Sequence, residues 1–343
     1  MISLIINALL NMNRFHSLCF FGFVCAIAIC ACSPNRGRAS YAPLNEDSSP
    51  HFTNAVYYWK TTFALNEAEQ AFLQRHQIDR IYMHMFDVAP EVDATDGKVQ
   101  IVPIATTRFA DKVPAGVEVV PTAYITTEAL RGIGNEEIAE YATLIVERMR
   151  AMAGYNGCGR ISEMQFDCDW TASTRETYFA LCREAGAILH RDTIALSSTI
   201  RLHQLREEVP PVDRGVLMLY NTGSLRSPKT RNSILDIDDV KTYLGKKTQY
   251  PLRLDYAFPA FGWGIKFRDG RFYAIVSNPD AEQCAEGETI RVERPTAAEV
   301  LGVKTWVDSL LGKPQSGNIL YHLDNSQLKY MTDDEIDKIY AYR

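Results

Sequence analysis

The sequence lacks the short motifs that mark common nucleotide, metal and serine-hydrolase sites. It has no G-x-G-x-x-G and no G-x-x-x-x-G-K-[ST], so a nucleotide-binding fold is without its usual support. No G-x-S-x-G is present, which argues against an esterase-type triad. His84, His203 and His322 do not occur in H-x-x-x-H spacing, and the cysteines match no zinc pattern. We therefore expect neither a cofactor nor a metal site.

Basic residues are fewer than acidic ones, and cysteines are few. The chain has 36 Lys and Arg against 42 Asp and Glu, a formal net charge of −6, which argues against nucleic acid as a partner. Four of its eight cysteines, Cys158, Cys168, Cys182 and Cys284, follow residue 51. Cys168 and Cys182 fall on predicted packing faces, which favours small core residues over a disulfide.

The amino-terminal segment resembles a lipoprotein signal. Arg14 is its only charged residue before an apolar run over residues 18–31, which is too short to span a bilayer comfortably. The run ends in Ala31-Cys32, a small residue before a cysteine, and this resembles the lipobox of bacterial lipoproteins. The resemblance implies a signal peptide over 1–31 and a membrane anchor through a lipid on Cys32. A plain secretory peptide is the alternative.

The segment after Cys32 predicts a tether and a location. Residues 32–51 are rich in Ser, Pro, Asn and Arg, which is typical of a flexible linker. In lipoproteins of the Bacteroidetes type, acidic residues soon after the lipidated cysteine mark surface export, and residues 33–38 contain none. We therefore expect a bacterial envelope protein in the outer membrane, with the periplasmic face favoured over the cell surface.

A strand-then-helix rhythm runs through the rest of the chain and predicts parallel βαβ units. Eight strands are expected at 55–60, 80–86, 118–125, 164–169, 193–200, 215–220, 252–257 and 318–323. Helices are expected at 66–76, 135–153, 175–190, 203–208, 237–244, 296–311 and 333–342. This count favours a (β/α)8 TIM barrel over residues 52–343 rather than an open doubly wound sheet. Asp269-Gly270 predicts a β-hairpin insertion after the seventh strand.

Two carboxylates share one face of the fourth strand. Apolar and polar residues alternate strictly from Met164 to Asp169, so Gln165, Asp167 and Asp169 point the same way. Two neighbouring carboxylates repel each other and are costly to bury, which favours a polar, partly wet cavity. Caps and salt-bridge partners at a strand end are the alternative.

Polar and aromatic residues also end the other predicted strands, where a barrel has its site. The candidates for substrate binding are Trp59, His84, Tyr124, Gln165, Arg201, Tyr220, Asn221, Tyr256, Trp263 and Asp324. Aromatic rings stack on the CH face of a sugar, and carboxylates and amides bind its hydroxyls. The sequence therefore predicts a carbohydrate as partner, with Asp167, Asp169 and Asp255 as catalytic candidates. Core packing is the alternative for the tryptophans.

Two segments resemble glycoside hydrolase family 18, the chitinase-like hydrolases. Asp167-Cys168-Asp169-Trp170 resembles the fourth-strand motif D-G-x-D-x-D-x-E, with Asp167 and Asp169 on its second and third acids. Met218-Leu219-Tyr220-Asn221 resembles the sixth-strand M-x-Y-[DN]. The resemblance implies a TIM barrel in which the third acid orients the substrate's acetamido group and the tyrosine holds it.

The chain departs from that family at the proton donor. Thr171 stands where the family has its Glu, and a hydroxyl does not donate a proton usefully near neutral pH. Met164 and Gln165 replace the leading Asp-Gly. The chain is also similar to bacterial lipoproteins with a Q-x-D-x-D strand, for which the resemblance implies a barrel and no activity.

Three functions remain open at this point. The first is a glycoside hydrolase in which Asp169 works with Asp255, Glu128 or Asp324. The second is a non-catalytic barrel that binds glycans. The third is a structural or assembly lipoprotein whose 258–263 loop contacts a protein partner.

Overall fold

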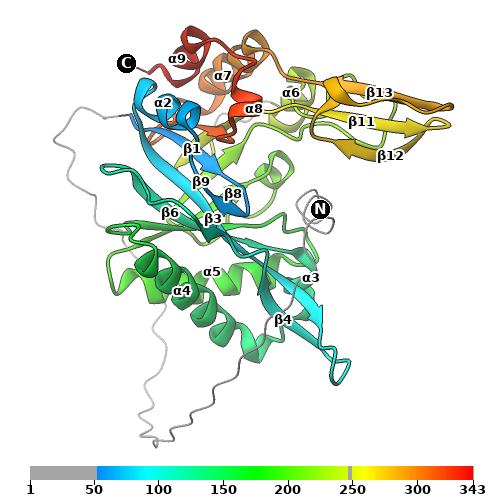
Figure 1. The fold of residues 1–343 in the computed structure, drawn as a ribbon. Coiled ribbons are helices and arrows are strands. Elements are labelled where there is room, and N and C mark those ends of the chain that lie inside the picture. The colour runs from blue at the N-terminus through cyan, green and yellow to red at the C-terminus, as the bar shows by residue number, and fades with distance from the viewer. Residues whose placement is uncertain (1–51, 246–248, 343) are drawn as a thin grey trace, which may run out of the picture. The chain divides into compact units, whose positions relative to one another are not determined.

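The protein folds as a closed parallel barrel. A computed structural model describes residues 52–245 and 249–342, so the predicted signal peptide, tether and Cys32 lie outside the described part. There, nine strands run in the order β1-β14-β10-β9-β8-β7-β6-β3-β4, and β1 also pairs with β3 (Figure 1). All of these pairings except β3–β4 are parallel, so eight strands close into a ring. The predicted (β/α)8 barrel is confirmed.

The barrel strands lie close to the predicted segments. They are β1 (Asn54–Tyr58), β3 (Ile78–Val92), β6 (Glu118–Ile125), β7 (Glu163–Asp167), β8 (Ala195–Ile200), β9 (Arg214–Met218), β10 (Leu254–Pro259) and β14 (Asn318–Tyr321). β3 continues well beyond its predicted end and pairs antiparallel with β4 (Val99–Ile104), with a turn that includes Asp96-Gly97. Two further short strands, β2 (Thr62–Phe63) and β5 (Arg108–Phe109), pair with each other.

Helices follow most of the barrel strands. They are α2 (Glu67–Arg75), α3 (Thr127–Gly132), α4 (Ile138–Tyr155), α5 (Arg175–His190), α6 (Ile237–Leu244), α7 (Ala297–Leu311), α8 (Asn325–Leu328) and α9 (Asp333–Tyr340), with short 3-10 helices η1 (Asn135–Glu137), η2 (Leu202–Arg206) and η3 (Pro279–Ala281). α4 and α5 lie side by side on the outside of the barrel (Figure 1). No helix among the described residues is long and apolar enough to cross a membrane.

Local sequence explains where the helices begin. Asn66 caps α2 and Glu69 returns the bond, a capping box that satisfies two backbone N–H groups. α5 begins at Arg175 as predicted, although the side chain of Thr174 accepts a bond from Thr171 N instead of capping the helix. Cys168 and Cys182 are buried free thiols, which confirms their prediction as core residues.

A small antiparallel sheet follows β10. β11 (Trp263–Arg268) and β12 (Arg271–Val276) turn at Asp269-Gly270, where both residues have positive φ angles, and β13 (Glu288–Glu293) pairs with the other edge of β11. The sequence predicts the hairpin but not the third strand. Figure 1 shows this sheet projecting away from the barrel.

Candidate functional site

The carboxyl ends of β7 and β8 hold a buried ion pair. Asp167, the last residue of β7, accepts a hydrogen bond from Thr199 Oγ1 at 2.6 Å, and Arg201 Nη1 lies 2.8 Å from the same Oδ1 atom. Arg201 also donates to Thr199 Oγ1 at 2.8 Å and contacts Met218 Sδ. Burial alone would lower the pKa of the Arg201 guanidinium, but the carboxylates of Asp167 and Asp169 raise it above its ordinary value. Asp167 Oδ1 therefore accepts a hydrogen bond from Thr199 and is ion-paired with Arg201.

Asp169 follows the end of β7 and stays accessible. Its side chain is 54% exposed, whereas Cys168 and Trp170 on either side are fully buried. Trp170 packs against Tyr178 and Phe179 of α5, which fixes the backbone that carries Asp169. Burial raises the pKa of Tyr124 on β6, and the carboxylates of Asp167 and Asp169 raise it further. Asp169 thus lies within electrostatic reach of the barrel end where Asp167 sits.

Aromatic rings gather around Tyr321 at this end of the barrel. The rings of Tyr220 and Tyr321 stack with centroids 4.8 Å apart and an interplanar angle of 25°. Trp59, Tyr57 and Phe261 contact Tyr321 at 5.9, 5.7 and 5.6 Å between centroids. Sequence reasoning missed Tyr321 and Phe261 as site residues. The available signal for Tyr321 was its position at the end of a predicted strand, next to other strand ends that also carry tyrosine.

The hydroxyl of Tyr220 is an unsatisfied donor. It is buried and has no hydrogen-bond partner among the described residues. Burial, together with the nearby Tyr321 hydroxyl and the Asp167 carboxylate, raises the pKa of Tyr220 well above its ordinary value. The hydroxyl therefore keeps its proton at neutral pH, and it lies within electrostatic reach of Asp167.

The other inward-facing candidates form the floor and rim. Gln165 is buried, accepts a bond from Tyr57 Oη at 2.7 Å and donates to Ser197 Oγ at 3.2 Å. Trp59 is part-exposed at the rim, 4.8 Å between centroids from the buried ring of His84. His84 in turn bonds to Asp87 at 2.7 Å and to Thr107 at 3.2 Å. Asn221, exposed beside Tyr220, has a φ of 56°.

The sequence prediction puts Asp255 at the carboxyl end of its strand, and this is wrong. It lies at the start of β10, where its Oδ1 accepts bonds from Ser316 N at 2.5 Å and Gly317 N at 3.1 Å. Burial raises its pKa, which those backbone bonds and Arg214 partly offset. It belongs to a buried charge cluster with Glu163 at the amino ends of the strands, opposite Asp167 and Asp169. Asp255 is therefore not part of this site.

Three more predicted residues turn away from the mouth or serve the fold. Tyr256 donates to Gly312 O at 2.7 Å, at the end of α7, because adjacent strand residues face opposite sides. Asp324 caps α8 by accepting from Ser326 N at 2.9 Å. Trp263 is buried and donates to Glu293 Oε2 at 2.8 Å, so it packs at the base of the small sheet instead of offering an open platform.

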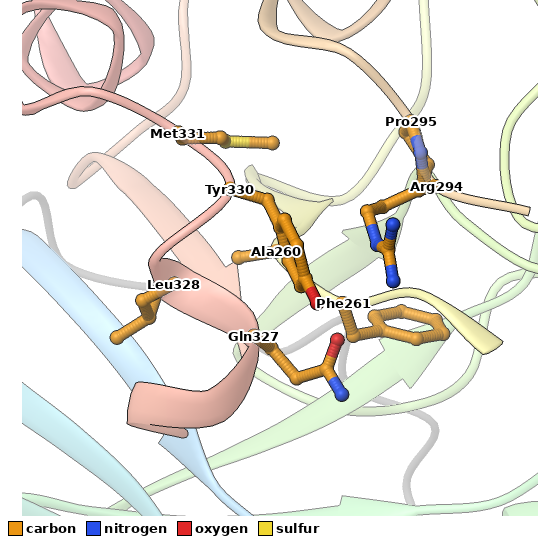
Figure 2. Close-up of a pocket in the computed structure, with 8 residues that line it drawn as sticks. All are labelled: Ala260, Phe261, Arg294, Pro295, Gln327, Leu328, Tyr330 and Met331. Atoms are coloured by element: carbon orange, nitrogen blue, oxygen red, sulfur yellow. The ribbon is translucent and has the colours of Figure 1, made fainter. Parts of the chain in front are cut away.

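A small pocket lies next to Phe261, between the segment after β10 and α8 (Figure 2). Its volume of about 10 Å³ is enough for roughly one water molecule. The residues around it are Ala260, Phe261, Arg294, Pro295, Gln327, Leu328, Tyr330 and Met331. It is too small for a sugar. As for metals, no group of three or more His, Cys, Asp or Glu side chains in the described part of the chain is arranged to hold one.

Comparison with solved structures identifies the fold. The chain is similar to the spore cortex-lytic enzyme SleL of Bacillus megaterium QM B1551, with 13% identity, a TM-score of 0.52, and coverage of 88% of this chain and 79% of that one. It is similar to ChiB, a GH18 chitinase from the chitin utilization locus of Flavobacterium johnsoniae, at 12% identity and a TM-score of 0.52, covering 85% and 94%.

A class V chitinase from Nicotiana tobaccum in complex with NAG4 is similar at 11% identity and a TM-score of 0.50, covering 85% of this chain and 99% of that one. No family model and no curated protein matches the chain. At these identities the likeness establishes the fold, which is a TIM barrel like that of glycoside hydrolase family 18.

Proposed function

We propose that this chain is an envelope glycoside hydrolase that cleaves a glycan carrying N-acetyl groups. The observation that carries the proposal is the Tyr220 hydroxyl, a buried donor without a partner among the described residues, within electrostatic reach of Asp167. Leaving such a donor unsatisfied costs roughly 1–3 kcal/mol, so a bound group is expected to satisfy it. An acetamido group offers an acceptor to Tyr220 and a donor to Asp167 Oδ2.

Asp169 is the proton donor in this proposal. Moving the family 18 motif by two residues keeps the same inward face, because side chains repeat every second position along a strand. That register assigns Gln165, Asp167 and Asp169 to the second acid, the third acid and the Glu. The accessible carboxyl of Asp169 then supplies what Thr171 lacks.

The reaction would be assisted by the substrate. Asp167 is engaged by Arg201 and Thr199, so it is not free to act as the nucleophile. If the acetamido oxygen of the substrate attacks the anomeric carbon instead, the reaction needs no second free carboxylate. The three carboxylates that the sequence suggests as catalytic partners of Asp169 are engaged elsewhere. Asp255 lies at the opposite end of the barrel, and Asp324 caps α8. Glu128 is exposed and pairs with Arg131. The similar solved structures support the substrate class, since two are named as chitinases and one is described with NAG4 bound.

A glycan panel tests this function. Full-length protein would be incubated with tetra-N-acetylchitotetraose, peptidoglycan and unacetylated cello-oligosaccharides, with products followed by mass spectrometry. We expect cleavage of N-acetylated glycans alone, and a loss of at least about 100-fold in Asp169→Asn, the usual size of an acid-catalyst contribution. Asp238→Asn, a change at an exposed carboxylate on α6, is the matched control. Unchanged turnover in Asp169→Asn would remove it from the mechanism.

A non-catalytic glycan-binding barrel is the second candidate. Thr171 favours it, because the family's own donor position lacks an acid and the side chain instead contacts Ser173 Oγ at 3.0 Å. Calorimetric titration with tetra-N-acetylchitotetraose separates the two functions. Binding with no product after prolonged incubation supports this candidate, and product formation excludes it.

The envelope location is part of the proposal. Arg14, the apolar run over 18–31 and Ala31-Cys32 support lipid attachment at Cys32, with the protein held in the outer membrane and facing the periplasm. Metabolic labelling with an alkyne fatty acid in a bacterial host tests it. The wild-type protein should incorporate label, and Cys32→Ser should not.

A further inference from the structure

His203 stands beside the accessible carboxylate. Its Nε2 lies 3.5 Å from Asp169 Oδ1, and both side chains are about half exposed. His203 belongs to η2, which directly follows β8, whereas Asp169 follows the neighbouring strand β7. The pair therefore spans two adjacent strand ends on the side of the barrel that holds Asp167.

A buried glutamine fixes the position of this pair. Gln204, next to His203 in the chain, is fully buried. Its Nε2 donates to Cys168 O at 3.3 Å and Trp170 O at 3.0 Å, the carbonyls on either side of Asp169. Its Oε1 accepts from Arg201 N at 2.8 Å. One side chain thus fastens the backbone of η2 to the backbone that carries Asp169, which keeps His203 next to Asp169.

A lone aspartic acid is a poor proton donor near neutral pH. An ordinary aspartyl carboxyl has a pKa near 3.9 and an ordinary histidine near 6.5, so at pH 7 roughly a quarter of ordinary imidazoles still hold a proton, against about one in a thousand ordinary aspartyl carboxyls. Asp167 offers no help, because its Oδ1 already accepts from Thr199 and pairs with Arg201. Among the described residues, His203 is the imidazole that lies beside Asp169, with its Nε2 3.5 Å from Asp169 Oδ1.

We propose that His203 is a positioning residue that keeps a transferable proton on the Asp169–His203 pair near neutral pH. This inference rests on the proposed function and deepens it. Asp169 contacts the glycosidic oxygen, and His203 acts through Asp169.

The step balances with substrate and water alone. The bond from the anomeric carbon to the leaving oxygen breaks, and that oxygen takes the proton from the pair as the acetamido oxygen bonds to the anomeric carbon. Water then attacks the same carbon, the acetamido bond breaks, and the proton released by the water returns to the pair. No oxidant or metal enters the balance.

Charged and titratable groups on the neighbouring elements surround the Asp169–His203 pair. Arg201 and Asp167 face the pair from the ends of β8 and β7, and Tyr124 faces it from β6. On η2 itself, Arg206 points away and donates to the Tyr243 and Thr242 carbonyls near the end of α6. Beyond η2, Glu207 is paired with Arg175 of α5 at 3.7 Å.

Two more charged residues near η2, Glu208 and Lys241, are also paired with other side chains. Glu208 pairs with Arg175 at 3.8 Å, and Lys241 on α6 pairs with Asp238 at 3.6 Å. The local field at the pair is therefore set chiefly by the Asp167–Arg201 ion pair, whose charges nearly cancel.

Leaving-group dependence tests the inference. Full-length wild type, His203→Gln and Asp169→Asn would be assayed on two β-glycosides of N,N′-diacetylchitobiose, one with 2,4-dinitrophenol and one with 4-methoxyphenol as leaving group. The dinitrophenolate leaves without protonation, so only the methoxyphenyl substrate needs the acid. We expect His203→Gln to lower kcat on the latter by about 10–100-fold at pH 7, and on the former by less than about 3-fold. KM should change little.

The pH profile gives a second reading. In His203→Gln the alkaline limb of kcat/KM on the methoxyphenyl glycoside should move to lower pH by more than about one unit, because a carboxyl ordinarily loses its proton at a lower pH than an imidazole does. His190→Gln is the matched control, because His190 forms an exposed pair with Asp213 at 2.8 Å. His190 lies at the end of α5 and Asp213 just before β9, away from the mouth, so its variant should behave as wild type.

The outcomes separate the two proposals. Equal losses on both glycosides, or an unmoved alkaline limb in His203→Gln while Asp169→Asn is inactive on the methoxyphenyl substrate, would overturn the role of His203 and leave the proposed function standing. If wild type cleaves neither glycoside, or Asp169→Asn matches it, the proposed function falls and takes this inference with it.

Discussion

Asp167 Oδ1 and Arg201 Nη1 lie 2.8 Å apart inside the barrel mouth, with the two side chains 7% and 19% exposed. They come from the ends of adjacent strands, β7 and β8, and Thr199 donates to the same carboxylate oxygen. Because the Thr199 hydroxyl and the Arg201 guanidinium, both from the end of β8, contact one oxygen of Asp167, the orientation of Asp167 is fixed before any ligand binds. The remaining oxygen is then available to a ligand.

Removing Arg201 should destabilise the protein strongly. Arg201→Met leaves the Asp167 carboxylate buried without its cation, and breaking such a pair from one side typically costs about 3–5 kcal/mol. Urea unfolding would measure the loss. Adding Asp167→Asn should recover a large part of it, because the uncompensated charge disappears. Arg271→Met on the exposed part of β12 is the control, and an equal loss there would contradict the prediction.

Tyr220→Phe should separate binding from stability. The hydroxyl has no partner among the described residues, so its removal should leave the free energy of unfolding within about 0.5 kcal/mol or raise it. Affinity for tetra-N-acetylchitotetraose should fall about 10-fold, the equivalent of one hydrogen bond. Tyr57→Phe is the comparison, because it breaks a buried bond to Gln165 and should cost about 1–3 kcal/mol. Unchanged affinity in Tyr220→Phe would count against the acetamido contact.

His322 should make stability depend on pH. Burial is the main reason that its pKa falls from 6.5 to about 4. Below about pH 6.5 the unfolded chain takes up a proton that the folded chain refuses, so stability is full above that pH and falls toward pH 4, by up to about 3 kcal/mol. In His322→Gln the slope of unfolding free energy between pH 6.5 and 4 should flatten. Leu144→Gln, a change at an exposed and non-ionisable residue of α4, should keep the wild-type slope.

Gln204→Leu should loosen the segment that carries Asp169. The change leaves the Cys168 and Trp170 carbonyls without their donor and Arg201 N without its acceptor. We expect a loss of about 2–4 kcal/mol, and faster amide hydrogen exchange over residues 168–171. Gln70→Leu, which removes one bond at an exposed position, should cost less than about 1 kcal/mol. Exchange at 168–171 equal to wild type would show that Gln204 does not hold the segment.

The barrel was predictable because most of its strands are short, apolar and followed by a helix signal. The alternation from Met164 to Asp169 also gave the correct inward face, and Gln165 and Asp167 lie inside as that face requires. Arg201 and Tyr220 were found by counting to the ends of the fifth and sixth strands.

The failures arose from strand ends and register. Placing the seventh strand at 252–257 made Asp255 look like an end residue, whereas β10 runs from Leu254 to Pro259 and Asp255 is near its start. Extending the eighth strand to 323 drew attention to Asp324, although β14 stops at Tyr321. Each residue advances a strand by about 3.3 Å, so boundary errors of two or three residues change which side chains lie at the mouth of the barrel.

One carboxylate joins the small sheet to the rest of the molecule. Glu293, buried at the end of β13, accepts from Trp263 Nε1 at 2.8 Å, from Arg291 Nε at 2.6 Å and from Ser233 Oγ in the segment between β9 and α6. Phe261, two residues before Trp263, packs on both Tyr220 and Tyr321. Phe261 also contacts Trp263, so these two rings link the projecting sheet directly to the stacked tyrosines at the barrel mouth.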